Sequence, residues 1–292
     1  MNLLLPLLLS LSLYGDRVAS ISNYSGNVAI KRSTNEIQLV TRKRTPLFNN
    51  DIVKTSKTGT CSILFTDGSR IDLNSSTLIK ISTSSRSKEI AISEGSLTSD
   101  IKKISGSRTT FRTPSGIAAV KGTVVDIEVK TDDSVDLSAD LGMLTYKIDT
   151  EKLSTDINNG NKISVKQYDD GVSTKSIVGT IKIKIDNLIS KLTQDDNIKS
   201  STNNDKISIG VIKGNPETTT LRDSRIQMSK GDEVEFVQSA MGMTVTVITG
   251  QVIMVYSDGS RYKLDKGETS VEKSGIWSEP ETPEGNEVQI IR

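Results

Sequence analysis

Residues 111–129, FRTPSGIAAVKGTVVDIEV, have the pattern of a strand, a break and a second strand. Pro114 fixes φ and has no N–H to donate, so the first strand is expected to end there. Gly116 and Gly122 mark turns or bends on either side of a short apolar run. The chain then alternates, with Val125, Ile127 and Val129 on one side and Asp126, Glu128 and Lys130 on the other. This period of two is typical of a strand with one face against a core.

The rest of the chain repeats this pattern of short strands separated by turn residues. Ser, Thr, Ile and Val are prominent, which favours strands over helices. Aromatic residues make up only 4% of the 292 residues, so the core must be built mainly of Ile, Val and Leu. Thr66-Asp67-Gly68-Ser69 between two alternating runs is a strong hairpin signal. Strand spacings of roughly 8–12 residues predict an all-β fold, a sandwich or β-roll of short antiparallel strands with at most one amphipathic helix.

Charge and residue content narrow the classes of function. Lys and Arg number 37 against 36 Asp and Glu, so nucleic-acid binding has no global electrostatic support. There is no histidine, which removes the usual general base and the commonest transition-metal ligand. The single cysteine, Cys61, alternates with Ile63 and Phe65 and is expected to be a buried hydrophobic residue rather than a reactive thiol. We therefore expect no cofactor, no metal site and no nucleic-acid partner.

The N-terminus has the pattern of an export signal. Leu3–Leu13 is an apolar run broken only by Pro6, Ser10 and Ser12, and it is shorter than the roughly 20 residues of a spanning helix. It fits the apolar region of a secretory signal, with cleavage after Gly15 or after Ser20. A buried N-terminal strand or helix is the alternative. No other stretch approaches a transmembrane span, so we expect an exported protein that is periplasmic or associated with the cell envelope.

Several short motifs lie between residues 22 and 165. They are Gly26-x-Val28, Asp51-Ile52-x-x-Thr55, Ile63-Leu64-Phe65-x-Asp67-Gly68-Ser69-x-Ile71-x-Leu73, Ser93-Glu94-Gly95-x-Leu97 and Thr113-Pro114-x-Gly116-x-Ala118-x-Val120-Lys121-Gly122-Thr123. This succession resembles the FecR domain, which is named for the periplasmic regulator of ferric citrate uptake. Asn50 stands where the family usually has Gly, and Lys121 where Arg is common.

The resemblance has limits for function. In the regulator type, a cytoplasmic sigma-factor-binding segment and a membrane span precede this domain, whereas about 20 residues with an export pattern precede it here. We therefore do not carry anti-sigma activity over to this chain. What the resemblance implies is a set of structural motif positions, with no catalytic, cofactor-binding or metal residue. They are Asp67, Gly68, Ser69, Thr113, Pro114, Gly116, Val120, Lys121, Gly122 and Thr123.

An internal repeat follows the motifs. Val135–Val165 contains Gly142 and Gly160, and Val245–Val271 contains Gly250 and Gly267 at nearly the same separation. In the second copy, Asp258-Gly259-Ser260-Arg261 repeats the letters of Asp67-Gly68-Ser69-Arg70. The pattern predicts one β unit used twice, each copy a hairpin with Gly at turns or bends. Chance similarity between β-rich sequences is the alternative.

The pattern changes between the two copies. Ile181, Ile185, Leu188 and Leu192 fall on one face of an amphipathic helix, which predicts a helix over Ser173–Leu192, with a β-branched strand as the alternative. Thr193–Lys206 is polar and predicts a mobile linker. The predicted division is an export signal at 1–20, a FecR-like β domain at 21–170, a helix and linker at 171–206, a smaller β unit at 207–278, and a tail at 279–292 in which Val288–Ile291 is a candidate last strand.

Carboxylates are the remaining candidates for catalysis. Asp132-Asp133, Asp169-Asp170 and Asp195-Asp196 are adjacent acids, and such pairs are turn formers first. The Asp-Gly-Ser segments lack the Asp-x-Asp-x-Asp-Gly pattern of a calcium loop. Trp277 and Tyr256 are candidates for a sugar-stacking platform, although packing roles are favoured because aromatic residues are so few.

Three functions remain open at this point. The favoured one is a non-enzymatic envelope protein that acts as a binding, scaffold or signal-input module and contacts an envelope protein, peptidoglycan or a second copy of itself. The alternatives are an envelope enzyme acting on polysaccharide and a periplasmic regulator of a transmembrane signalling system. Edge strands are natural docking points for the first, because their unpaired N–H and C=O groups accept another strand.

Overall fold

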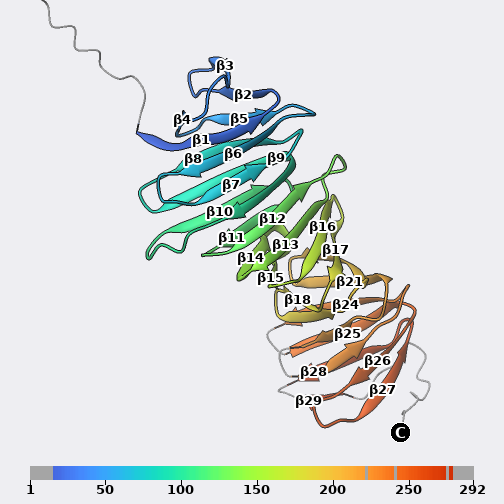
Figure 1. The fold of residues 1–292 in the computed structure, drawn as a ribbon. Helices are drawn as coiled ribbons and strands as arrows, with labels where there is room; N and C mark the ends of the chain where they lie inside the picture. Colours follow the sequence, from blue (N-terminus) through green and yellow to red (C-terminus); the bar gives the residue numbers. More distant parts are fainter. Residues whose placement is uncertain (1–15, 221–222, 240–241, 274–275, 279–292) are drawn as a thin grey trace, which may run out of the picture.

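The computed structural model describes residues 16–220, 223–239, 242–273 and 276–278. They form two long sheets, A and B, packed face to face in an elongated sandwich whose N-terminal and C-terminal elements lie at opposite ends (Figure 1). Neighbouring strands are antiparallel except for β9 and β10. The only helical element in the described residues is a short 3-10 turn, η1 (Asp149–Glu151). The all-β prediction is confirmed.

Each sheet has fifteen described strands, and β9 belongs to both. Sheet A has the order β4 (Thr45–Phe48), β1 (Arg17–Ser25), β6 (Thr60–Phe65), β7 (Arg70–Leu73), β9 (Ser87–Asp100), β12 (Val124–Val129), β13 (Val135–Leu141), β16 (Lys162–Tyr168), β17 (Gly171–Val178), β20 (Asn197–Asn203), β21 (Lys206–Lys213), β24 (Glu233–Ser239), β25 (Gly242–Thr249), β28 (Thr269–Lys273) and β29 (Ile276–Trp277).

Sheet B runs alongside sheet A. Its order is β3 (Ile37–Leu39), β2 (Val28–Lys31), β5 (Ile52–Thr55), β8 (Leu78–Thr83), β9, β10 (Arg108–Thr113), β11 (Gly116–Val120), β14 (Met143–Ile148), β15 (Leu153–Asn158), β18 (Ile181–Ile185), β19 (Leu188–Leu192), β22 (Glu217–Thr219), β23 (Arg225–Gln227), β26 (Gln251–Val255) and β27 (Arg261–Asp265).

β9 passes from one sheet to the other at Gly95. Its first half pairs with β8 and β10 in sheet B, and its second half pairs with β7 and β12 in sheet A. Gly95 has φ +86°, and a Cβ there would lie 2.5 Å from Ser76 O. Only glycine fits this close approach without strain.

From β10 onward, successive hairpins alternate between the two sheets. The inward residues of both sheets join in one hydrophobic cluster, in which Val125 and Ile127 of β12 are fully buried and Val129 nearly so. The period-two alternation around Gly122 therefore identified the core face correctly.

The predicted helix over Ser173–Leu192 is wrong, because this segment forms β17, β18 and β19. Ile181, Ile183 and Ile185 are buried at a period of two while the lysines between them are exposed. The helix-like spacing arises because Ile185 and Leu188 face each other across the tight turn that joins β18 to β19. The predicted polar linker at 193–206 is likewise a turn followed by β20, and β20 pairs with both β17 and β21.

The internal repeat is present and extends further than the sequence indicated. Gly142 and Gly250 both have positive φ where the chain leaves sheet A for sheet B, and Gly160 and Gly267 both have positive φ where it returns. Two more units lie between the copies, with Gly179 and Gly214 at the sheet A to sheet B switch. The four glycines of this switch recur at intervals of 35 to 37 residues.

Residues Arg17–Ser20, which the sequence analysis placed in the export signal, belong to β1. Ala19 is buried and pairs with Leu47 on one side and Phe65 on the other. Residues 1–15, and the predicted tail with its last strand at Val288–Ile291, lie outside the described residues.

Candidate functional site

Loop 101–107 connects β9 to β10, and two of the sequence motifs converge on its base. The backbone N–H of Lys102 donates to Ser69 Oγ at 3.2 Å, and the N–H of Ile101 donates to Thr123 O at 3.1 Å. Gly122 has φ +65°, and a Cβ there would lie 2.7 Å from Lys103 Cβ. Residues that are far apart in the sequence thus hold one loop.

The first of these motifs is a tight hairpin turn between β6 and β7, as predicted. Ser69 N donates to Asp67 Oδ1 at 2.9 Å, Phe65 N donates to Ser69 O, and Gly68 has φ +81°. The turn presents Ser69 Oγ toward loop 101–107 and the other carboxylate oxygen of Asp67 toward Lys88.

The second motif includes the turn between β10 and β11. The N–H of Gly116 donates to Thr113 Oγ1 at 3.2 Å, and the Tyr146 hydroxyl is hydrogen-bonded to Thr113 Oγ1 at 2.8 Å and to Ser115 Oγ at 3.0 Å. Tyr146 is fully buried, and burial raises the pKa of its phenol. A Cβ on Gly116 would lie 2.5 Å from Lys147 O, which explains the glycine.

Tyr146 was not singled out by sequence reasoning, although a lone Tyr at a core-facing position of an alternating strand was the available signal. Of the remaining motif positions, Val120 is buried and Lys121 is exposed. Asn50, at the position where the family usually has Gly, has φ +67°, a conformation that Asn tolerates better than most residues.

A surface hollow of about 750 Å³ lies beside loop 101–107. Its walls come from the start of β1, the residues around the β6–β7 turn, the turn at 83–88 and residues 104–107. Arg17 and Arg86 lie exposed among its lining residues, and Ile104 is a partly exposed apolar residue of the same hollow. The lining also includes Asp16 and Asp67, so the hollow combines apolar groups with charges of both signs, and its cations are in excess.

Lys88 and Asp67 form an ion pair within this hollow. The Lys88 Nζ lies 2.6 Å from Asp67 Oδ2 and 4.1 Å from the centre of the Phe65 ring, and its side chain is only 9% exposed. Burial lowers the pKa of Lys88, an effect that Asp67 partly opposes. Burial alone would raise the pKa of Asp67, but hydrogen bonds from Lys88 and from the Ser69 N–H outweigh it and lower the pKa.

The adjacent acid pairs lie in three separate turns. Asp132 Oδ1 accepts from the Ser134 N–H, Asp170 pairs with Lys199, and Asp196 Oδ2 accepts from the Thr193 N–H. The structure does not bring the pairs together. Their role as turn formers accounts for the contacts they make.

The two candidate sugar-stacking residues pack against each other near the C-terminal end. The Tyr256 and Trp277 rings are stacked at 5.9 Å, each residue is only 9% exposed, and the Tyr256 hydroxyl is hydrogen-bonded to Ser270 Oγ at 2.8 Å. Packing, the favoured interpretation, describes them correctly. Cys61 is also buried, and burial is the main reason that its pKa is raised to about 12.

No cluster of three or more His, Cys, Asp or Glu side chains in the described ranges is arranged to hold a metal ion. No helix within them is long and apolar enough to span a membrane.

The two motif segments and the loop that they hold fall within one family match. Residues 51–142 match the family model described as FecR protein. This FecR-like segment contains all ten motif positions that the resemblance implied, and loop 101–107 as well. No curated protein matches the chain.

Solved structures show weaker similarity. Two crystal structures of a candidate anti-sigma factor from Parabacteroides distasonis are 16% and 15% identical, and each match covers 43% of this chain and 59% of that one, with a TM-score of 0.38. The match therefore spans less than two thirds of that protein. The TCP10 domain of Danio rerio CPAP, in complex with a STIL peptide, is 13% identical over 76% of this chain and 99% of that chain, with a TM-score of 0.13. At these TM-scores the similarities inform neither fold nor function.

Proposed function

We propose that the protein is a non-enzymatic module of the cell envelope that binds a partner through its FecR-like segment, with loop 101–107 as the contact. The observation that carries this proposal is the convergence of two motif segments on the base of that loop through Ser69, Gly122 and Thr123. The family match supports a role in signal input, because FecR itself is a periplasmic regulator.

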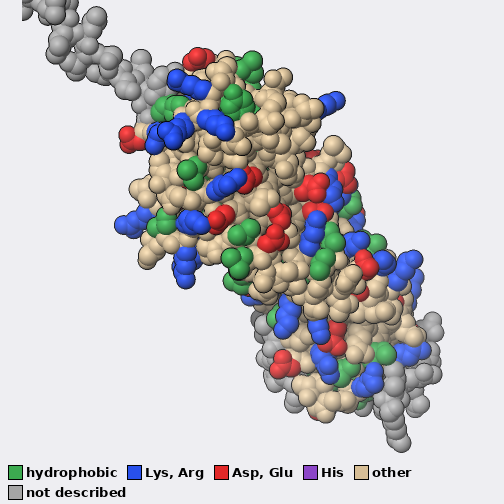
Figure 2. All heavy atoms as spheres, viewed as in Figure 1, with side chains coloured by type: hydrophobic (Ala, Val, Ile, Leu, Met, Phe, Trp, Pro, Cys, Tyr) green, Lys and Arg blue, Asp and Glu red, His purple; other side chains and the backbone are tan. Residues whose placement is uncertain are grey.

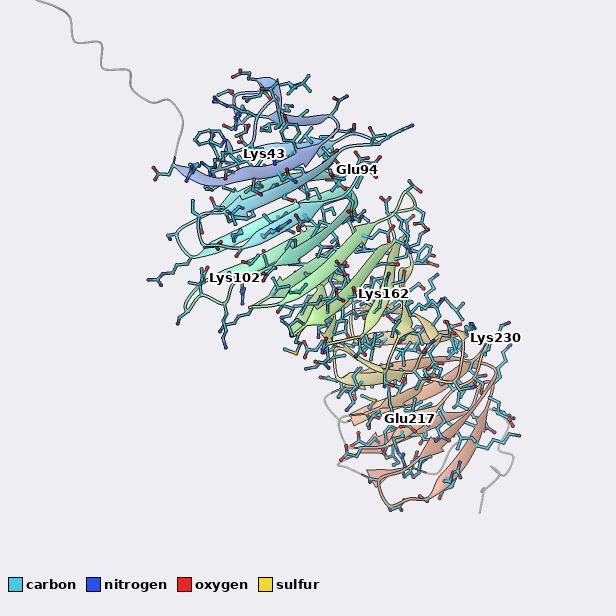
Figure 3. The ribbon with its side chains drawn as sticks, in the orientation of Figure 1. Lys43, Glu94, Lys102, Lys162, Glu217 and Lys230 are labelled. Carbon is cyan, nitrogen blue, oxygen red and sulfur yellow. The ribbon has the colours of Figure 1, made fainter. Side chains whose placement is uncertain are left out.

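The loop combines a fixed base with an exposed tip. Residues 102–106 are all exposed, and Figure 3 labels Lys102 among them. A loop held by its scaffold and exposed at its tip is the usual arrangement of a binding surface. The adjoining hollow adds Arg17 and Arg86, so a partner with acidic and apolar groups fits this face.

Export is part of the proposal, and the structure bears on the cleavage position. Cleavage after Gly15 leaves β1 intact, whereas cleavage after Ser20 removes Ala19 from the core and breaks its pairing with Leu47 and Phe65. We therefore expect the mature chain to begin before Arg17. Mass spectrometry of the mature N-terminus in the envelope fraction tests this, and an uncleaved cytoplasmic chain would contradict it.

The binding role is tested by site-specific photocrosslinking in intact cells. A photoreactive residue at Ile104 should capture one envelope component, identified by mass spectrometry. The same residue at Ile189, which has similar exposure on the outer face of sheet B, should not capture it. Ser69→Ala, which removes the acceptor of the Lys102 N–H, should reduce capture at residue 104. Equal capture at both positions would reject the loop as the contact.

The enzymatic alternative has its own test. Asp67 is the most enclosed carboxylate of the hollow through its pairing with Lys88, so it is the residue to replace. Turnover of an envelope polysaccharide by the purified chain, abolished in Asp67→Asn with the fold retained, would overturn the binding proposal.

A further inference from the structure

The N-terminal end of sheet B is an open edge. β3 pairs with β2 and with no other described strand. Backbone hydrogen bonds from Arg32 N to Glu36 O and from Val40 N to Val28 O flank this pairing. Hydrogen-bonded and non-hydrogen-bonded residue pairs alternate along two antiparallel strands, so within β3 it is Gln38 that exchanges backbone hydrogen bonds with β2. The N–H and C=O groups of Ile37 and Leu39 therefore point away from the sheet.

The side chains on this edge are also unusual. Ile37 is 70% exposed and Leu39 is 63% exposed, the two highest values among the large hydrophobic residues described. Natural edge strands are normally protected by charges, proline or a covering element. β4, the corresponding edge of sheet A, carries Pro46, and its carbonyl accepts a hydrogen bond from Arg32 Nη1 at 3.1 Å. β3 has neither proline nor charge.

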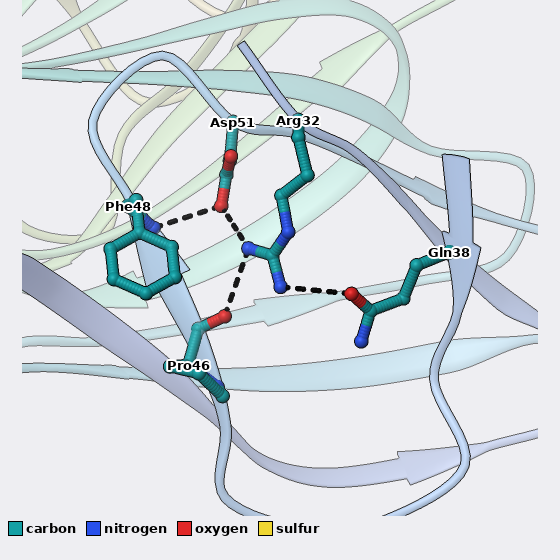
Figure 4. Close-up of polar contacts among 5 residues, drawn as sticks. All are labelled: Arg32, Gln38, Pro46, Phe48 and Asp51. Carbon is teal, nitrogen blue, oxygen red and sulfur yellow. Dashed lines mark hydrogen bonds and ion pairs between the residues drawn. The ribbon is translucent and has the colours of Figure 1, made fainter. Parts of the chain in front are cut away.

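A buried ion pair holds β3 in place (Figure 4). Arg32 Nη2 donates to Gln38 Oε1 at 3.1 Å, and Arg32 Nη1 lies 2.5 Å from Asp51 Oδ2. That Asp51 oxygen also accepts from the Phe48 N–H at 2.8 Å. Because the side chains of Arg32 and Asp51 are almost fully buried, the edge is fixed before any partner arrives, which reduces the ordering cost of binding.

Glu36 directly precedes β3, and positive charge lies at the same end of the molecule, on the connection from β3 to β4. Arg42, Lys43 and Arg44 come shortly after β3, all are exposed, and none forms an ion pair with another described residue. Figure 2 shows Lys and Arg side chains interspersed with hydrophobic ones at the N-terminal end, and Figure 3 places Lys43 there. An extended segment that is both acidic and apolar complements this surface.

Residues 279–291 of the chain, EPETPEGNEVQII, have that composition, with four Glu followed by Val288-Gln289-Ile290-Ile291. We propose that β3 accepts residues 279–291 of a second copy as an added strand, with Arg42, Lys43 and Arg44 facing its glutamates. The proposal goes beyond the proposed function, because β3 lies outside the FecR-like segment and gives the protein a second contact.

The docking must occur between copies. The fifteen strands of sheet B, about 4.8 Å apart, place β3 about 67 Å from the C-terminal end of the sheet. Residues 279–291 span at most about 47 Å when fully extended, so they cannot reach their own β3. A contact that joins opposite ends of identical molecules is heterologous and produces open head-to-tail chains of copies.

Analytical ultracentrifugation of residues 16–292 and two variants tests this. The first variant carries Ile37→Glu and Leu39→Glu, and the second ends at residue 278. The parent chain should associate with concentration, and each variant alone should be monomeric. An equimolar mixture of the two variants should stop at a one-to-one dimer, because only one functional edge and one functional tail remain. Circular dichroism melting of each variant confirms that the exposed-site changes leave the fold intact.

A fluorescent peptide of residues 279–292 provides the second measurement, with the chain ending at 278 as acceptor. Replacing Arg42, Lys43 and Arg44 with Gln should weaken peptide binding about tenfold and reduce its salt dependence. The matched control, Lys182→Gln with Lys184→Gln and Lys191→Gln, should change nothing, because these exposed lysines lie on β18 and β19, far along sheet B from β3.

Three results would overturn the proposal. The first is a parent chain that stays monomeric at about 1 mM, the weak end of specific affinity. The second is association that persists when residues 279–292 are removed. The third is a scrambled peptide of the same charge that binds as tightly as the peptide of residues 279–292. Failure here leaves capture at residue 104 unaffected, so this test and that of the loop contact are distinguishable.

Discussion

Asp196 Oδ1 occupies the space that a Cβ on Gly214 would need, and it accepts a hydrogen bond from the N–H of the next residue, Asn215, at 3.1 Å. The same relationship recurs one unit later, where Asp232 Oδ1 lies against Gly250 and accepts from the Gln251 N–H at 3.0 Å. A buried carboxylate thus closes both of these crossings from sheet A to sheet B. One unit earlier, Asn161 takes the same place against Gly179.

Gly214→Ala should destabilise the protein by about 3 kcal/mol, since it adds a steric overlap with Asp196 to the strain of a non-glycine residue at positive φ. Gly231→Ala is the matched control, because Gly231 has φ +93° against +91° for Gly214 but has nothing within 4 Å of the added Cβ. It should cost only about 1–2 kcal/mol. Urea denaturation of both variants measures the difference, and equal losses would show that the contact with Asp196 contributes nothing.

Tyr146→Phe should cost about 1–2 kcal/mol of unfolding free energy. The change removes the hydroxyl that bonds Thr113 Oγ1 and Ser115 Oγ in a buried site. Tyr168→Phe, at a tyrosine that is 44% exposed, should stay within about 0.5 kcal/mol. Thermal or urea unfolding compares the two, and a neutral Tyr146→Phe would contradict a structural role for the Thr113 motif position.

Asp67→Asn should lower the free energy of unfolding at neutral pH. The difference in that free energy between the variant and the parent chain should become smaller in acid. Hydrogen bonds from Lys88 and the Ser69 N–H lower the pKa of Asp67 below its ordinary value of 3.8 despite burial. A carboxyl with a depressed folded pKa contributes stability above its unfolded pKa and loses it as pH falls through the folded value. Urea midpoints measured from pH 7 down to the acid transition follow the difference.

The control for that experiment is Lys88→Met, which keeps most of the length of the buried side chain and removes its charge. This variant should also reduce the part of the pH dependence of stability that comes from Asp67, because the hydrogen bond and the charge of Lys88 both lower the pKa of Asp67. If the plots of urea midpoint against pH for the parent chain and Asp67→Asn run parallel, Asp67 has the same pKa in the folded and unfolded states.

Cys61 should resist thiol reagents in the folded protein. Its pKa is raised to about 12, first by burial and then by the charge of Asp72. Because the thiolate is the reactive form, we expect labelling at pH 8 about a thousandfold slower than in the urea-unfolded chain. A spectrophotometric thiol assay measures both rates, and comparable rates in the two states would contradict the burial.

Local pattern was a good guide wherever the pairing is local. The turn at Asp67-Gly68-Ser69 and the turn at Asp258-Gly259-Ser260 have the same bonds, in which the Ser N–H donates to the Asp Oδ1. Both are fixed by neighbouring residues, so the sequence could predict them. The helix error at Ser173–Leu192 shows the limit, because Ile185 and Leu188 are three residues apart both on a helix face and across a tight hairpin.

The sequence by itself determined the strand composition, the core-facing residues and the glycine turns, since alternation and positive φ are properties of a few adjacent residues. Only the tertiary structure decided that hairpins alternate between two sheets, that Ser69 and Thr123 hold one loop, and that β3 ends as an open edge. These depend on the register between strands distant in sequence. Register is set by the packing of the whole sandwich, which no short window of sequence contains.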